Sequence, residues 1–213
     1  NVTEMVKKKW QYTWRRVRNS LKSKRDEDLF REKQQELHQL EVLAKEEYLT
    51  LAYYDETGFS LTSSIPYAWQ EKGKTTEIPA AKGKRINVGG FLSADGKQLQ
   101  AYQTEKAILS KDVVSFFDDF AKQVKRKTIV VLDNAPTHRS KEFMSKIPQW
   151  EEQDLYVYFL PSYSPELNKI EILWRKMKYE WMPFDAFESF ENLKNRLSQL
   201  IQSVGQKYTI KFV

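Results

Sequence analysis

The chain has 213 residues, no cysteine, a net charge of +6 and only two histidines, His38 and His138. Without cysteine it has neither a disulfide framework nor a thiolate zinc site, so a catalytic metal would bind mainly through oxygen. Apolar residues make up 40% of the sequence, which argues against a disordered chain, and no apolar run is long enough to span a bilayer. The length predicts one domain, with room for a short extra element at one end.

The positive charge is concentrated at the N-terminus. Residues 1–25 hold nine basic residues and one acidic residue, a charge of +8, so the other 188 residues sum to −2. The basic residues that we assign to DNA binding are Lys7, Lys8, Lys9, Arg15, Arg16, Arg18 and Lys22. Such density favours a nucleic-acid-binding arm, although a solvated, lysine-rich helix end has the same composition.

Two helices are predicted before the first strand. In the basic segment, apolar residues recur every three to five positions, which is typical of an amphipathic helix and suggests the last helix of a DNA-binding unit. In the second, Phe30, Leu37, Leu40 and Ala44 form one apolar stripe. We therefore predict a DNA-binding remnant over residues 1–25, a helical linker over 26–47 and a catalytic domain over 48–213.

Residues from Tyr48 onward change to the two-residue period of strands. Residues 49–54 form a β-rich run that ends at Asp55, and residues 85–93 and 97–104 are two strands joined by the tight turn Asp95-Gly96. Ser110 is predicted to cap a helix, and residues 128–132 are a strand buried on both faces. A helix over 140–150 and a strand over 155–160 follow.

The C-terminal third is predicted to be helical. Ser164 and Pro165 are typical of an N-cap and first helical residue, and the helix that they open should run toward Trp181. A last helix begins near Phe190 and is closed by Gly205. The order of elements predicts an α/β fold in which helices flank a mixed sheet, as in the ribonuclease H-like fold.

Three acids are placed so that they can meet. Asp55 and Asp133 each end a predicted strand, and Glu171 lies about two turns into the helix after the last strand. Three carboxylates suit Mg²⁺ or Mn²⁺, and two such ions can activate a nucleophile and stabilise a leaving oxygen in phosphate chemistry. Taken singly, Asp55 and Asp133 are equally consistent with strand-ending turns, and Glu171 with a helix-surface acid. Only the set indicates a metal site.

Asn134 and His138 follow the second acid and are candidate supporting residues. His138 could contact a phosphate or order a metal-bound water, but a local hydrogen-bonding role is commoner, and the same holds for Asn134. Trp69 could stack on a base, although packing is the commoner role of such a residue.

The three blocks resemble those of the mariner-type DDE transposases, and most closely their bacterial insertion-sequence branch. The matching blocks are Tyr-Asp-Glu-Thr-Gly-Phe at 54–59, Leu-Asp-Asn-Ala-Pro-Thr-His at 132–138, and the run from Leu160 to Trp174. By this resemblance Asp55, Asp133 and Glu171 are the catalytic, metal-binding acids. Lys169 departs from the family's pattern, because a proline that would stiffen the helix entry usually stands there. Glu56 and Glu166 are the competing acids.

The resemblance implies a complete function. The enzyme would bind the inverted-repeat ends of its element as double-stranded DNA, cleave there with Mg²⁺ or Mn²⁺, and join the 3′-hydroxyl to target DNA, usually at a TA step. It also implies a homodimer on DNA. Because no apolar run could span a bilayer, we expect no membrane partner. We expect a fragment from a bacterial cytoplasm, associated with the nucleoid, or from a nucleus if the host is eukaryotic. A hydrolysis-only nuclease and a domesticated, non-catalytic DNA-binding protein are the alternatives.

Overall fold

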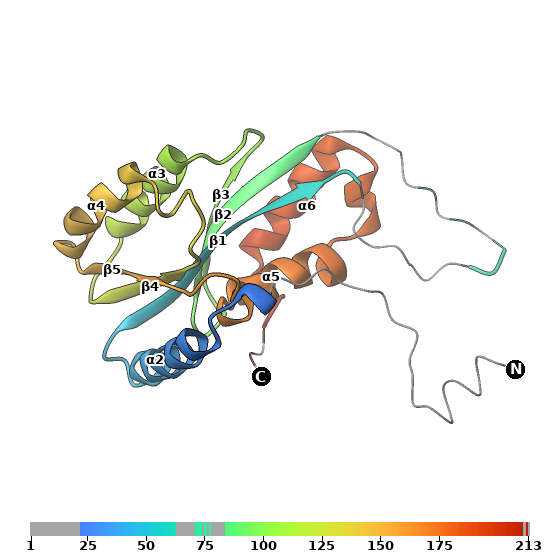
Figure 1. Ribbon diagram of the computed structural model, residues 1–213. Helices are drawn as coiled ribbons and strands as arrows, with labels where there is room; N and C mark the ends of the chain where they lie inside the picture. The colour runs from blue at the N-terminus through green and yellow to red at the C-terminus, as the bar shows by residue number, and fades with distance from the viewer. Residues whose placement is uncertain are drawn as a thin grey trace, which may run out of the picture.

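The computed structural model describes residues 22–62, 71–73, 75, 77, 84–210 and 212. At its centre is a five-stranded mixed sheet in the order β3-β2-β1-β4-β5 (Figure 1). The strands are β1 (Thr50–Ser60), β2 (Arg85–Ser93), β3 (Leu99–Thr104), β4 (Thr128–Leu132) and β5 (Leu155–Phe159). The pairs β1–β2 and β2–β3 are antiparallel, whereas β4 is parallel to both β1 and β5. This confirms the predicted α/β fold with a mixed sheet between helices.

Helices cover both faces of the sheet (Figure 1). The α-helices are α2 (Glu27–Lys45), α3 (Ser110–Ala121), α4 (Lys141–Glu151), α5 (Ile170–Lys176) and α6 (Phe190–Gln202). Shorter elements are η1 (Lys22–Lys24), η2 (Pro165–Leu167), the π-helix η3 (Met177–Trp181) and η4 (Phe184–Phe187). No helix in the described ranges is long and apolar enough to cross a membrane.

Alternation along the strands divides the core into two layers. Tyr53 of β1 packs with α2, α5 and α6 in one buried cluster, whereas its neighbour Tyr54 packs with α3 and α4 in the other. Leu37 on the predicted stripe of α2 is buried in the first cluster, and Phe30, Leu40 and Ala44 pack against that cluster. The predicted stripe is therefore confirmed, and it docks α2 onto the sheet.

Two predicted helix starts and one predicted strand end are wrong. Ser110 is the first residue of α3 and not its N-cap. Leu109 takes the N-cap position, where its backbone N–H donates a hydrogen bond to the Asp112 carboxylate at 2.8 Å. Strand β1 continues past Asp55 to Ser60, since its pairing with β4 ends at Tyr53 but its pairing with β2 does not.

The helix predicted to begin at Ser164 is also divided. Ser164 makes no capping hydrogen bond, and η2 stops before Asn168, whose backbone is extended (φ −94°, ψ 100°). Helix α5 therefore begins only at Ile170, and Glu171 lies in its first turn rather than two turns into a helix. The interruption has a physical cause, because the Asn168 amide is held by a hydrogen bond to the Tyr54 carbonyl of β1.

The predicted N-terminal features lie outside the described residues. These are the amphipathic helix and the DNA-binding candidates Lys7, Lys8, Lys9, Arg15, Arg16 and Arg18, and the same is true of Trp69. The backbone of Lys22 opens η1. The assignment of these basic residues, and the domain boundaries built on them, stay predictions.

Candidate active site

Strand register places the first two acids side by side. The last residues paired between the parallel strands β1 and β4 are Tyr53 and Val131. Asp55 and Asp133 each lie two positions beyond this last pair, and the charge of Asp133 acts on Asp55. Parallel strands set equivalent positions near each other, which is why two acids far apart in sequence come together where β4 ends beside the middle of β1.

The third acid comes from the helix packed over this part of the sheet. Ile170 and Trp174 of α5 are buried in the same cluster as Tyr53, and the ring of Trp174 lies against Gly90, the β2 residue paired with Asp55. Glu171 is in the first turn of this helix, where a carboxylate is favoured by the helix dipole. The helix thus brings Glu171 toward the two aspartates.

Charge repulsion shows that the three acids share one neighbourhood. Burial and the nearby charges of Glu171, Glu56 and Asp133 hold the pKa of Asp55 well above its ordinary value. Burial also raises the pKa of Glu171, and the charge of Asp133 adds to this while Lys178 opposes it. The pKa of Asp55 is therefore raised by the charges of both other acids, and that of Glu171 by the charge of Asp133. This concentration of negative charge favours the binding of a cation.

His138 is completely buried between two carboxylates. Its Nδ1 lies 2.8 Å from Asp133 Oδ1 and its Nε2 lies 3.1 Å from Glu56 Oε1. Burial alone would lower the pKa of His138, but the hydrogen bonds to Asp133 and Glu56 raise it to about 10. His138 is therefore a charged imidazolium that donates from both nitrogens, which confirms the predicted local hydrogen-bonding role.

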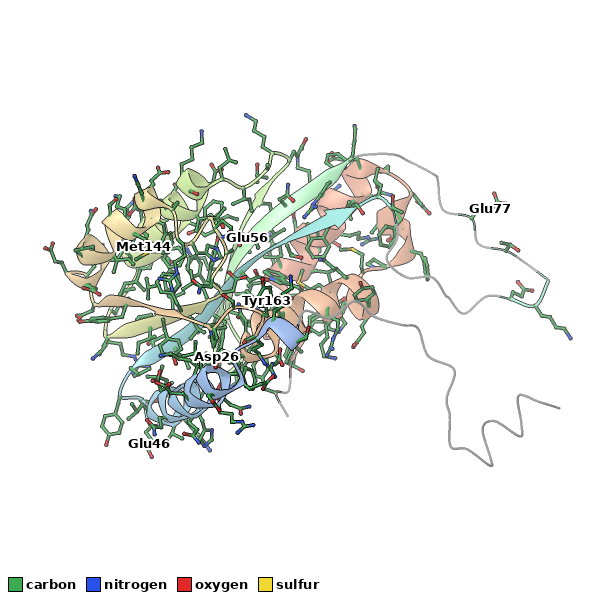
Figure 2. The ribbon with its side chains drawn as sticks, viewed as in Figure 1. Asp26, Glu46, Glu56, Glu77, Met144 and Tyr163 are labelled. Atoms are coloured by element: carbon green, nitrogen blue, oxygen red, sulfur yellow. The ribbon has the colours of Figure 1, made fainter. Side chains whose placement is uncertain are left out.

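The second acid is held in place by this histidine. Asp133 Oδ1 also accepts the Ala135 N–H at 3.0 Å, and despite burial the contact with His138 lowers the pKa of Asp133. Asn134 points elsewhere, since it is exposed and its side-chain oxygen accepts a hydrogen bond from Arg139. Glu56, labelled in Figure 2, lies near the middle of the molecule in that view. It anchors His138, and its charge also acts on Asp55.

The three acids lie near one another but do not form a complete metal-binding site. In the described part of the chain, no group of three or more His, Asp or Glu side chains is arranged so that it could hold a metal ion as it stands. The donor set nevertheless fits a hard divalent cation. It consists of carboxylate oxygens whose mutual repulsion such a cation would relieve.

Two further residues at the site were not among the candidates. The Asn168 side chain is buried against the β1 backbone, with its Nδ2 2.9 Å from Tyr54 O, and its Oδ1 has no hydrogen-bond partner among the described residues. Lys178 of η3 interacts electrostatically with both Glu171 and Asp55, and burial together with Arg85 lowers its pKa. The sequence motif contains Asn168, and Lys178 follows Glu171 by seven residues, which is about two helical turns and therefore the same side of the helix.

The sequence comparisons decide the family. A family model described as DDE superfamily endonuclease matches residues 50–194, a span that contains all three acids. The chain belongs to the DDE superfamily endonucleases. No curated protein sequence matches it.

Solved structures with the same fold come from a mariner transposase. This DDE endonuclease is similar to the Mos1 transposase in a paired-end complex with the left transposon end (17% identity, TM-score 0.61) and in a paired-end complex with Mg (15%, 0.59). Each match covers 95% of this chain and 62% of the Mos1 chain. The catalytic domain of Mos1 mariner transposase matches at 14% identity and a TM-score of 0.51, over 89% of this chain and 86% of that domain. At these identities the likeness establishes the fold, which is ribonuclease H-like.

Proposed function

We propose that this DDE endonuclease is the catalytic domain of a DNA transposase that cleaves transposon ends and joins them to target DNA. The observation that carries the proposal is the concentration of negative charge where Asp55 of β1, Asp133 after β4 and Glu171 of α5 lie near one another, because the charges of Glu171 and Asp133 act on Asp55 and that of Asp133 acts on Glu171. Support comes from the family match over these residues and from the fold shared with Mos1 transposase.

In this proposal the three acids hold divalent metal, either Mg²⁺ or Mn²⁺ and as a pair of ions. Bound metal would activate a water or a 3′-hydroxyl and stabilise the leaving oxygen of an in-line displacement at phosphorus. The same residues would serve cleavage and joining, because both reactions exchange one oxygen for another at a phosphate. A Mos1 paired-end complex contains Mg, in line with this choice of ion.

The residues around the acids have supporting roles. His138 holds Asp133 by its Nδ1–H and is itself held by Glu56, so the orientation of the Asp133 carboxylate is fixed before DNA arrives. Lys178, beside Glu171 and Asp55, limits the repulsion between them. Such outer contacts orient metal ligands and tune their affinity.

The remaining parts of the proposal concern DNA. We infer that the basic arm, with Lys7, Lys8, Lys9, Arg15, Arg16, Arg18 and Lys22, contacts the phosphates of double-stranded transposon ends. The proposal also includes joining to target DNA at TA steps, cut-and-paste movement, and a homodimer that pairs two transposon ends. Neutralising Arg15, Arg16 and Arg18 should lower the log–log salt slope of DNA binding by about 0.9 for each phosphate that the arm no longer neutralises. An unchanged slope would remove the arm from the DNA interface.

A strand-transfer assay tests the catalytic proposal. The purified chain is mixed with Mn²⁺, a supercoiled plasmid and a pre-cleaved DNA end that carries a free 3′-hydroxyl. Joined products are expected from the unmodified chain and from Asp119→Asn, which neutralises a carboxylate on α3 that pairs with Lys122 of the same segment. They should vanish with Asp133→Asn.

The other outcomes separate the alternatives. Nicking without joining that disappears in Asp133→Asn would favour a hydrolysis-only nuclease. DNA binding with no metal-dependent reaction in any variant would favour a domesticated, non-catalytic protein. Loss of folding in Asp133→Asn would instead give Asp133 a structural role.

A further inference from the structure

The entry to α5 is attached to β1 through residues that no motif assigns to the site. Lys169 immediately precedes α5, and its Nζ lies 2.7 Å from Glu41 Oε1 in α2. The same Glu41 oxygen accepts the hydroxyl of Tyr53 at 2.6 Å. One carboxylate of α2 therefore links the start of the helix that carries Glu171 to the strand that carries Asp55.

This link is sheltered and sits close to the acids. Tyr53 is fully buried, and the side chains of Lys169 and Glu41 are only 23% and 27% exposed. Glu171 follows Lys169 by two residues, and Asp55 follows Tyr53 by two residues. Ion pairs with this degree of burial and short, shared contacts are screened less by water than pairs on an open surface.

A second contact at the neighbouring residue fixes the same junction. Asn168 Nδ2 donates to the Tyr54 carbonyl, so Asn168 and Lys169 are attached to Tyr54 and Tyr53 in turn. Between them these contacts set both the distance and the rotation of the first turn of α5 relative to β1. Helix α5 has only seven residues and needs such contacts to hold its direction.

We propose that Lys169 and Glu41 form a positioning pair that orients the first turn of α5, and with it Glu171, toward Asp55 for metal binding. The inference rests on the proposed function and adds to it two residues that do not touch the reacting atoms. It also explains how the chain manages without the proline expected at position 169. Lys169 has φ −61° and follows an extended residue, a backbone that proline would adopt, and the ion pair supplies the restraint that the ring would give.

Direct binding of Mn²⁺ to the whole chain, measured by calorimetry at neutral pH, tests this pair without relying on catalysis. Lys169→Met and Glu41→Gln should each weaken Mn²⁺ binding by about 10- to 100-fold, the usual effect of removing a group that orients a metal ligand. The double variant should bind no more weakly than either single one, because both changes remove one shared interaction.

Lys146→Met is the matched control. The Lys146–Asp118 pair is similarly exposed and 3.1 Å long, but it joins α4 to α3 on the opposite face of the sheet. Its removal should lower the melting temperature about as much as Lys169→Met and leave Mn²⁺ affinity unchanged. A metal affinity reduced equally by Lys146→Met would reduce the Lys169 effect to general destabilisation and overturn the inference.

Lys169→Pro adds a rescue. It removes the ion pair but restricts the helix entry, and it should recover most of the Mn²⁺ affinity that Lys169→Met removes. Unchanged affinity in Lys169→Met, additive effects in the double variant, or a Lys169→Pro chain that binds as weakly as Lys169→Met would each contradict the inference. Failure of the unmodified chain to bind Mn²⁺ would instead count against the proposed function itself.

Discussion

The two faces of the sheet are built from different interactions. On the α3–α4 face, Tyr54, Phe91, Phe117, Phe143 and Trp150 form a continuous aromatic core with ring centroids 4.7–5.1 Å apart. On the α2–α5–α6 face, packing is interrupted near the acids by polar contacts, and the helix that carries Glu171 is short and continues as a π-helix. The first face behaves as scaffold, whereas the second exchanges regular packing for a charged site.

If this division is correct, changes on the site face should remove activity with little loss of stability. Glu171→Gln should slow Mn²⁺-dependent nicking by at least about 1000-fold, because bound metal contributes several kcal/mol to the transition state and about 1.36 kcal/mol is a factor of ten. Glu166→Gln, a change in the competing acid next to α5, should keep most of the activity. The check is a nicking time course with both variants alongside thermal melts. Equal reductions of the nicking rate in Glu171→Gln and Glu166→Gln would contradict the choice of Glu171 over Glu166 as the third acid.

Changes on the scaffold face should do the reverse. Phe117 is fully buried and contacts Tyr54, Phe91, Phe143 and Trp150, so Phe117→Ala should lower the free energy of unfolding by about 3–5 kcal/mol. Urea denaturation measures this decrease. The fraction that stays folded should bind Mn²⁺ normally, and a selective loss of metal affinity would mean that the two faces are not independent.

The sequence predicted the scaffold face better than the site face. The apolar runs of β4 and of α3 fix the strand and the buried side of the helix by periodicity alone. The three acids were proposed because each belongs to a distinctive block, and the parallel pairing of β1 with β4 ends two residues before Asp55 and Asp133.

What the sequence did not predict depends on contacts between distant segments. Asn168 and Lys169 contact β1 and α2, more than 100 residues earlier, and these contacts delay the helix that local signals place at Pro165. The ion pair from His138 to Glu56 likewise joins residues 82 positions apart. Helix propensity and capping rules describe only near neighbours in the chain.

His138 packs against Tyr54 and Phe143 of the α3–α4 face and contacts Asp133, so its charge links this face to the acids. Its pKa of about 10 exceeds the 6.5 of an ordinary histidine, so its stabilising contribution is complete below pH 6.5 and is lost as the pH rises toward 10. Without divalent metal, the free energy of unfolding should therefore fall over this window by about 1.5–3 kcal/mol, the value of a hydrogen bond to a charged group. Melts of His138→Gln across the same range should show a flatter profile. Identical slopes in both proteins would contradict a charged His138.

Asp55 gives the sharpest contrast, because here stability and activity should change in opposite directions. Its pKa is raised in the folded chain by burial and by Glu171, Glu56 and Asp133, so without metal its ionisation destabilises the fold increasingly as pH rises above the ordinary value of 3.8. Asp55→Asn removes that repulsion and should raise the free energy of unfolding at neutral pH by about 0.5–2 kcal/mol. It should also abolish nicking.

Saturating Mn²⁺ completes the Asp55 test. The unmodified chain should gain stability from the ion, because ligand that binds only the folded state stabilises it, whereas Asp55→Asn should gain little. The two melting curves should therefore approach or cross when metal is added. If Asp55→Asn is less stable than the unmodified chain without metal, Asp55 is a structural turn acid. Replacing a carboxylate that stabilises the fold through hydrogen bonds lowers the free energy of unfolding under all conditions, whereas replacing one that binds a cation lowers it only when the cation is present.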